Sequence, residues 1–173
     1  MKLEQSHLPV NSLIEKSFSK IDYSDAFMCR FTSEKKIIVD DLVKAFAYSA
    51  PAWVEKLFSM RNRIVKLIGL KVPDEKKKEQ DKENFTVEVG NSLGLFKILD
   101  KNLNEVIMGE DDKHLNFRIS LFLENDYNNY SFTLSTTVQH NNWLGKLYFI
   151  PVRPFHKFIV PSMMKGIIKN INK

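Results

Sequence analysis

Cysteine is nearly absent from this sequence. Cys29 is the single cysteine among 173 residues. One thiol can form neither an internal disulfide nor a cysteine-based zinc cluster. Cys29 lies in an apolar run with the period of a strand, so we predict an inert core thiol. A reactive thiol would need a low pKa and access to solvent.

The sequence also lacks the short motifs of common catalytic and nucleotide-binding sites. It has no Gly-x-Gly-x-x-Gly or P-loop, no Gly-x-Ser-x-Gly elbow and no His-Glu-x-x-His. A basic strand with interleaved aromatic residues, which would suit single-stranded nucleic acid, is missing as well. We therefore predict no cofactor and no nucleic-acid partner.

Long apolar runs are missing too. No uninterrupted stretch of about 18 apolar residues exists, so no transmembrane segment is expected. The first seven residues contain no apolar segment of the kind found in a signal peptide. These two observations predict a cytoplasmic protein.

Acidic residues are absent from the last part of the chain. None follows Asp126, whereas six basic residues do: Lys146, Arg153, Lys157, Lys165, Lys169 and Lys173. The net charge of +5 therefore arises in this segment. Two readings stay open, a solvated lysine stripe along one helix or a surface that docks an acidic protein or an anionic membrane.

The residues that are present have the balance of a globular protein, with 43% hydrophobic and 27% charged residues. Residues 23–31 alternate with a period of two and predict a strand with Phe27, Cys29 and Phe31 on one face. Two helices are expected next, at about 42–47 and 52–68. Residues 1–20 read as a weakly structured polar lead-in, and 71–84 as a charged loop, ordered or mobile. We predict one domain over residues 21–173.

Residues 85–140 read as consecutive strands joined by tight turns, one of them at 109–112. One strand carries alternating hydroxyl groups at Ser131, Thr133, Ser135 and Thr137, which we expect to face solvent. The last segment has an amphipathic pattern interrupted by Pro151 and Pro154. Because proline ends or bends a helix, we predict two helical pieces, the second beginning near Phe155.

The order of elements is a strand, two helices, a meander of strands and a closing helix. This order resembles that of the START and birch-pollen-allergen superfamily, which has the helix-grip fold. The resemblance implies an α+β fold in which a curved antiparallel sheet wraps around a long C-terminal helix, with two helices inserted after the first strand.

Several stretches make the resemblance more specific: residues 22–27, Trp53 with residues 57–62, residues 109–118, and residues 142–145, 148–149 and 154–156. In this order they resemble the domain-of-unknown-function family 2867, over roughly residues 22–165. That family has no established activity. Some members resemble this domain fused to a dinucleotide-binding reductase domain, whose Gly-rich loop this chain lacks. Relatives in the wider superfamily bind lipids, sterols or polyketides between sheet and helix.

Polar side chains gather at the predicted start of one strand. By the period of two, His114 and Arg118 share a strand face, and Asp112 can orient His114 or pair with Arg118. One reading is an anchor for a ligand head group or a general acid–base pair. Asp111 belongs to the same cluster, and the other reading is a structural salt bridge at the strand start, with Asp in a turn. His140 and His156 lie near the ends of elements, but no spacing requires them to converge with His114, so we predict no metal site.

Aromatic side chains complete the candidate ligand-binding set: Trp53, Phe58, Trp143 and Tyr148, beside Asp112, His114, Arg118, His140 and His156. The aromatic members either line a pocket or fill the core. The first functional hypothesis is binding of a small hydrophobic or amphipathic molecule in a cavity between sheet and C-terminal helix. The alternatives are a cyclase- or hydrolase-like enzyme using Asp112 and His114, and an interaction module using the basic C-terminal helix.

Overall fold

The computed structural model describes residues 2–57, 59 and 85–172. In chain order the elements are β1 (Leu3–Ser6), the 3-10 helix η1 (Ile14–Lys16), β2 (Tyr23–Thr32), α1 (Val39–Phe46), β3 (Ser92–Leu93), β4 (Phe96–Lys101), β5 (Glu105–Asp111), β6 (Leu115–Asp126), β7 (Asn129–His140) and α4 (Trp143–Ile171). Residues 52–57 and 59 are helical as well.

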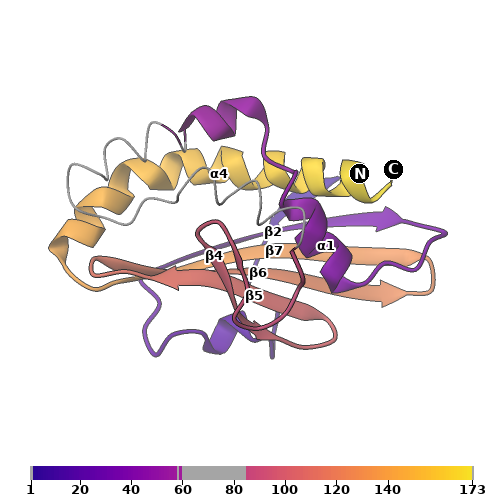
Figure 1. The fold of residues 1–173 in the computed structure, drawn as a ribbon, viewed down its shortest axis with the longest axis horizontal. Coiled ribbons are helices and arrows are strands. Elements are labelled where there is room, and N and C mark those ends of the chain that lie inside the picture. The colour runs from indigo at the N-terminus through magenta and orange to yellow at the C-terminus, as the bar shows by residue number, and fades with distance from the viewer. Residues whose placement is uncertain (1, 58, 60–84, 173) are drawn as a thin grey trace.

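The strands form one seven-stranded antiparallel sheet in the order β1-β2-β7-β6-β5-β4-β3. The strands from β3 to β7 follow one another as a meander, and β7 then pairs with β2, where Phe27 lies opposite Leu134. The sheet curves beneath α4, and α1 lies on the same side (Figure 1). The predicted α+β helix-grip arrangement is confirmed, including helices that follow the strand at Tyr23–Thr32.

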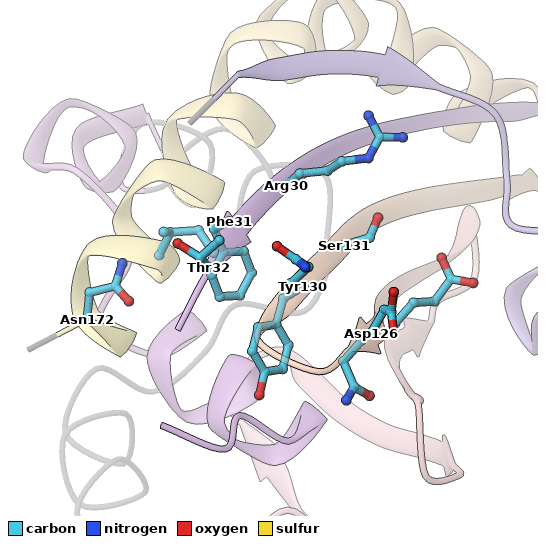
Figure 2. Close-up of a pocket in the computed structure, with 11 residues that line it drawn as sticks. Arg30, Phe31, Thr32, Asp126, Tyr130, Ser131 and Asn172 are labelled. Carbon is cyan, nitrogen blue, oxygen red and sulfur yellow. The ribbon is translucent and has the colours of Figure 1, made fainter. Parts of the chain in front are cut away.

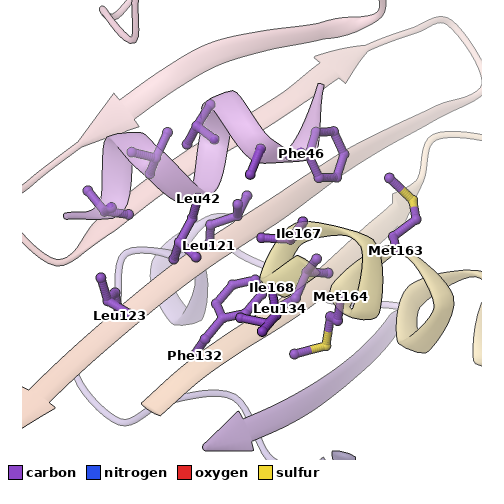
Figure 3. Packing of buried hydrophobic residues seen from close by; sticks show 14 of the residues in the cluster. Leu42, Phe46, Leu121, Leu123, Phe132, Leu134, Met163, Met164, Ile167 and Ile168 are labelled. Atoms are coloured by element: carbon purple, nitrogen blue, oxygen red, sulfur yellow. The ribbon is translucent and has the colours of Figure 1, made fainter. Parts of the chain in front are cut away.

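The core lies between the sheet and these helices. On β2 the inward residues are Phe27 and Cys29, and their partners on β7 are Leu134 and Phe132. Figure 3 shows how the two helices meet this face: Leu42 and Phe46 come from α1, Met163, Met164, Ile167 and Ile168 from α4, and Leu121, Leu123, Phe132 and Leu134 from the sheet. Burial raises the pKa of the Cys29 thiol to about 11, in agreement with the predicted inert thiol.

The prediction of two C-terminal helical pieces is wrong, because α4 is one helix of 29 residues with Pro151, Pro154 and Pro161 inside it. Pro151 and Pro154 leave the carbonyls of Leu147 and Ile150 without an N–H donor. Both of these residues are exposed, so water can satisfy the two carbonyls. Packing of the opposite side of α4 on the sheet stabilises the helix across the interruptions. The helix bends in its first turns (Figure 1), as proline-containing helices do.

Residues 2–20, predicted to be a weakly structured lead-in, contain a short strand and a 3-10 helix. Leu3–Ser6 pairs with β2 as an edge strand, and the chain then crosses the side of the sheet away from α4. There Ile14 of η1 is fully buried. The same segment covers the hydroxyl stripe of β7, so Thr133, Ser135 and Thr137 are buried, and our expectation that they face solvent is wrong. Ser17 Oγ lies 3.0 Å from Thr137 Oγ1.

A buried carboxylate fastens this segment to the sheet. Glu105 has no exposed surface and accepts hydrogen bonds from Leu13 N at 2.6 Å and Ile14 N at 3.2 Å. The Ser120 hydroxyl donates to the same carboxylate at 2.5 Å. The two N–H groups belong to Leu13, the N-cap residue of η1, and to Ile14, its first residue, and N–H groups at a helix start have no partner within the helix. Glu105 therefore accepts hydrogen bonds from the N–H groups at the start of η1, and the same bonds compensate for the burial of its carboxylate.

Two further expectations differ from the structure. The turn expected at residues 109–112 is not there, because β5 continues to Asp111. Gly109 lies inside that strand and packs so closely on the Phe117 carbonyl that a Cβ would collide with it, which is a packing reason for glycine. Residues 85–88 form no strand. Residues 60–68 of the predicted long helix and the predicted loop at 71–84 lie outside the described residues.

Replacing Glu105 with Gln is expected to lower the free energy of unfolding by about 1–3 kcal/mol, because the amide is uncharged and leaves one buried N–H unpaired. Urea unfolding followed by circular dichroism measures this. Glu124→Gln, at an exposed carboxylate on β6, is the control and should change stability by less than about 0.5 kcal/mol. Equal effects of the two substitutions would contradict the role given to Glu105.

Candidate functional site

An aspartate lies on the core side of β2. Asp25 shares the face of Phe27 and Cys29 and is 8% exposed. A carboxylate is costly to bury unless hydrogen bonds or an opposite charge compensate it. The neighbours of Asp25 therefore decide whether it is structural or functional.

Two side chains approach the same oxygen of Asp25. The Tyr23 hydroxyl donates to Oδ2 at 2.6 Å, and Nδ1 of His156, on α4, lies 2.8 Å from Oδ2. Tyr23 precedes Asp25 by two residues on the same strand face, and His156 comes from the helix that covers it. The three side chains form a hydrogen-bonded chain across the boundary between sheet and helix.

Three buried polar atoms beside this chain have no hydrogen-bond partner in the described part of the protein. They are Asp25 Oδ1, Thr136 Oγ1 and His140 Nε2. Thr136 lies directly opposite Asp25 in the pairing of β2 with β7, and His140 ends the same strand. Buried polar atoms are nearly always satisfied in folded proteins, so three unsatisfied ones on the same face of the β2–β7 pair are unusual. We name Tyr23, Asp25, Thr136, His140 and His156 the Asp25 cluster.

Aromatic rings frame the Asp25 cluster. Phe149 of α4 lies with its ring centroid 4.9 Å from that of Tyr23 and 5.5 Å from that of His140. The Arg153 guanidinium lies 5.5 Å from the Tyr23 ring centroid. Phe149 thus joins the tyrosine and histidine sides of the cluster and gives it an apolar wall.

Burial and neighbouring groups shift the pKa values of Tyr23 and Asp22. Burial, and then the neighbouring Asp25 carboxylate, raise the pKa of Tyr23 well above its ordinary value of 10.0. The hydroxyl is therefore a stable donor to Asp25. The pKa of Asp22 is lowered, first by its bond to Lys20 and then by the backbone N–H of His140. Its Oδ2 accepts from that N–H at 2.8 Å, which fixes the end of β7 beside the cluster.

A depression borders Asp25 at the edge of the sheet. The pairing of β1 with β2 stops at Ser6 and Ala26, so the preceding residues of β2 have no partner on that side. A depression of about 520 Å³ opens there. It is lined by Gln5, Ser6, His7, Leu8, Ser24, Asp25 and Ala26.

A second depression, of about 760 Å³, lies at the other end of α4. Figure 2 shows Phe31, Thr32 and Tyr130 of the sheet and Asn172 after the helix around it. The Tyr130 hydroxyl accepts from Ile37 N at 3.1 Å and donates to the Lys35 carbonyl at 3.3 Å. No unsatisfied buried side-chain atom found in residues 2–57, 59 and 85–172 belongs to its lining. The Asp25 end is therefore the stronger candidate.

The structure divides the polar residues that the sequence suggested. Arg118 points away from α4, with its guanidinium 4.6 Å from the Phe18 ring centroid and Nη1 2.8 Å from Asp111 Oδ1. Asp112 Oδ1 accepts from the backbone N–H of His114 at 3.4 Å, so this bond does not involve the imidazole. Arg118 and Asp112 thus contact different groups, Arg118 the carboxylate of Asp111 and Asp112 the backbone of His114.

His114 instead belongs to the start of α4. Its Nδ1 lies 3.0 Å from Nδ2 of Asn142, the N-cap residue, whose Oδ1 accepts from Gly145 N at 3.1 Å. Gly145 packs against the His114 carbonyl, where a Cβ would collide. The contacts of His114 thus anchor the first turn of the helix.

His140 and His156 are the two suggested residues that join the Asp25 cluster. Trp53 and Trp143 are exposed and Tyr148 is partly buried. Phe58 lies outside the described residues. The aromatic set therefore does not form one buried lining.

The sequence reasoning missed Tyr23, Asp25 and Thr136. A signal was present for Asp25, because the alternation that turns Phe27 and Cys29 inward also turns residues 23 and 25 inward. An inward carboxylate on an otherwise apolar strand face is a reason to suspect a site. Thr136 carried no such signal, since threonine is common in strands.

The arrangement can hold a polar group and move a proton. Asp25 Oδ1 offers an acceptor, Thr136 a donor and an acceptor, and His140 Nε2 either, according to its tautomer. His156 can accept or return a proton through Asp25. Within the described ranges no group of three or more His, Cys, Asp or Glu side chains is placed to hold a metal ion.

Comparison with known proteins gives a family and no function. The model of a family described as a protein of unknown function, DUF2867, matches residues 17–163. No curated protein matches the chain. The matched range contains the whole Asp25 cluster. The further resemblance to the START superfamily stays a prediction.

Tyr23→Phe tests the electrostatics of the cluster through pH. Above pH 10 the unfolded chain ionises this tyrosine while the folded chain keeps it protonated, so the wild type loses stability as pH rises. The Phe variant should be less stable near neutrality by about 1 kcal/mol, yet fall less steeply between pH 9 and pH 11 in urea unfolding. Tyr127→Phe, at an exposed position away from Asp25, should follow the wild type. A slope in Tyr23→Phe as steep as that of the wild type would disprove this account.

Proposed function

Because the chain belongs to the family DUF2867, whose description assigns no activity, we propose a function from the geometry: it binds a small amphipathic molecule between the sheet and α4. One polar group of that molecule is held by Asp25 and Thr136, and a second polar group is held by His140, further along β7. Its apolar part lies against Phe149 and the neighbouring core.

The observation that carries this proposal is the set of three unsatisfied buried atoms on the helix side of β2 and β7. An unsatisfied buried polar atom costs roughly 1–3 kcal/mol. A ligand that donates to Asp25 Oδ1 and pairs with Thr136 and His140 would remove that cost on binding. The depression beside β2 gives such a molecule a route to Asp25.

The surroundings favour an amphipathic ligand over a purely polar one. Val138, opposite Tyr23 on β7, is 2% exposed, and Phe149 is buried on α4. Apolar walls with a few convergent polar groups are the usual make-up of a small-molecule site. Polar groups also line the opening at Gln5, Ser6 and Ser24.

The alternative of an enzyme built on Asp112 and His114 has little support in the geometry. Asp112 binds the backbone of His114, and His114 contacts the N-cap of α4. These contacts engage Asp112 Oδ1 and His114 Nδ1 with groups next to the start of α4, and no contact between the two side chains supports an acid–base pair.

Native mass spectrometry of the protein purified from its own host tests the proposal. We expect a bound small molecule in the wild type and a roughly tenfold weaker complex in Asp25→Asn or Thr136→Val, since each removes a hydrogen bond to the ligand. Ser24→Trp, which fills the opening beside Asp25, should abolish the complex. Ser131→Trp fills the depression at the other end of α4 and is the matched control. Loss of the complex in Ser131→Trp alone would overturn the assignment.

Thr136→Val gives a second, independent readout. Valine keeps the shape of threonine but removes a buried hydroxyl that has no partner in the described chain. We expect the ligand-free variant to be more stable than the ligand-free wild type by about 1 kcal/mol in urea unfolding. Ser120→Val removes a buried hydroxyl that is bonded to Glu105 and should be destabilising. If Thr136→Val is also destabilising, the hydroxyl is satisfied and the site loses its main support.

A further inference from the structure

The side of α4 that faces away from the sheet is apolar in its first half. Trp143 is 70%, Leu147 56%, Ile150 63% and Phe158 68% exposed. Successive members are four, three and eight residues apart, spacings that return side chains to one side of a helix. We call these four residues the outer strip of α4.

A helix on the surface of a protein normally turns polar residues outward. The inner side of α4 already buries Phe149, Val160 and Met163 against the core. The outer strip is thus a second apolar side on the same helix, and core packing does not explain it. Exposed apolar side chains in a row indicate an interaction surface.

Basic residues run beside the outer strip. Lys146 and Lys157 are exposed and lie eleven residues, or about three turns, apart on one side of α4. Arg153 lies between them in sequence, with its guanidinium directed to the Tyr23 ring. The helix contains no acidic residue, and none follows Asp126 in the chain. A partner with negative charge therefore meets attraction along the whole helix.

We propose that α4 docks by its outer strip on an anionic lipid surface, lying in the plane of the membrane. Tryptophan and phenylalanine favour the boundary between headgroups and acyl chains, and flanking lysine and arginine bind anionic headgroups. None of the helices in the described chain, α4 included, combines the length and apolar content needed to cross a bilayer. The helix lies on the membrane while its inner side stays on the sheet. This inference does not depend on the small-molecule site.

The shape of the surface favours lipid over an acidic protein. From Trp143 to Phe158 the outer strip extends for roughly 22 Å along one helix. α4 covers this half of the sheet (Figure 1). A convex apolar ridge of this kind fits a deformable planar surface, whereas a protein partner would need a matching groove.

Vesicle co-sedimentation of the full chain tests the proposal. We expect binding to phosphatidylcholine vesicles that contain phosphatidylserine and much weaker binding to phosphatidylcholine alone. Ile150→Glu with Phe158→Glu should weaken binding at least about tenfold, because both charges would enter the apolar layer. The matched control is Val10→Glu with Leu103→Glu, two exposed apolar residues outside α4. Equal loss in both double variants would overturn the proposal.

Charge is tested separately. Lys146→Glu with Lys157→Glu should weaken binding to the anionic vesicles, whereas Lys36→Glu with Lys97→Glu, which changes the net charge equally at exposed sites off α4, should not. Raising the salt from about 0.05 M to about 0.5 M should weaken binding of the wild type.

In Trp53→Phe, Trp143 is the remaining tryptophan, and its emission should shift to the blue on anionic vesicles. The proposal would be overturned if the emission of Trp143 did not shift. It would also be overturned if the protein bound polyglutamate but did not bind vesicles.

Discussion

The pairing of β2 with β7 is the constraint on which the rest of the structure depends. It joins the first long strand to the last one, so that the helix following β7 turns back across both. The same register puts Asp25 opposite Thr136 and brings His156 of α4 above them. A shift of the register by one residue would turn Asp25 to the other face of the sheet. A neighbouring residue of β2 would then take its place on the helix side. The Asp25 cluster is thus a product of register as much as of residue type.

The two faces of the sheet are covered in different ways. α1 and α4 cover one face with a continuous apolar core, and this packing tolerates three prolines within α4. The other face carries hydroxyl groups and Glu105, and the segment around η1 covers it through hydrogen bonds. Hydrogen bonds require matched geometry, whereas apolar contacts mainly require volume. The N-terminal segment is therefore held in place by a few specific hydrogen bonds. α4 is held in place by the apolar area that it buries against the sheet.

Local patterns were sufficient to predict the fold class but not the site. Alternation in residues 23–31 predicted β2 and its inward face, and the amphipathic C-terminal pattern predicted a helix over the sheet. The failures are long-range. His156 lies 131 residues from Asp25, and Glu105 lies 91 residues from Ile14, so no spacing rule links either pair. Proline rules predicted a broken α4 because they consider the hydrogen bonds of a helix and leave out the sheet beneath it.

The separation between β2 and β7 also governs how the chain reaches this structure. Phe27 cannot meet Leu134 until more than a hundred further residues have been synthesised, as their numbering shows. Closing so long a loop costs entropy before any contact repays it, and chains dominated by such contacts fold slowly. On a ribosome, the apolar face of β2 emerges before β7 and has no neighbour there until the residues between them have been made. The sheet therefore cannot close before β7 arrives, and the nascent chain is open to aggregation until then.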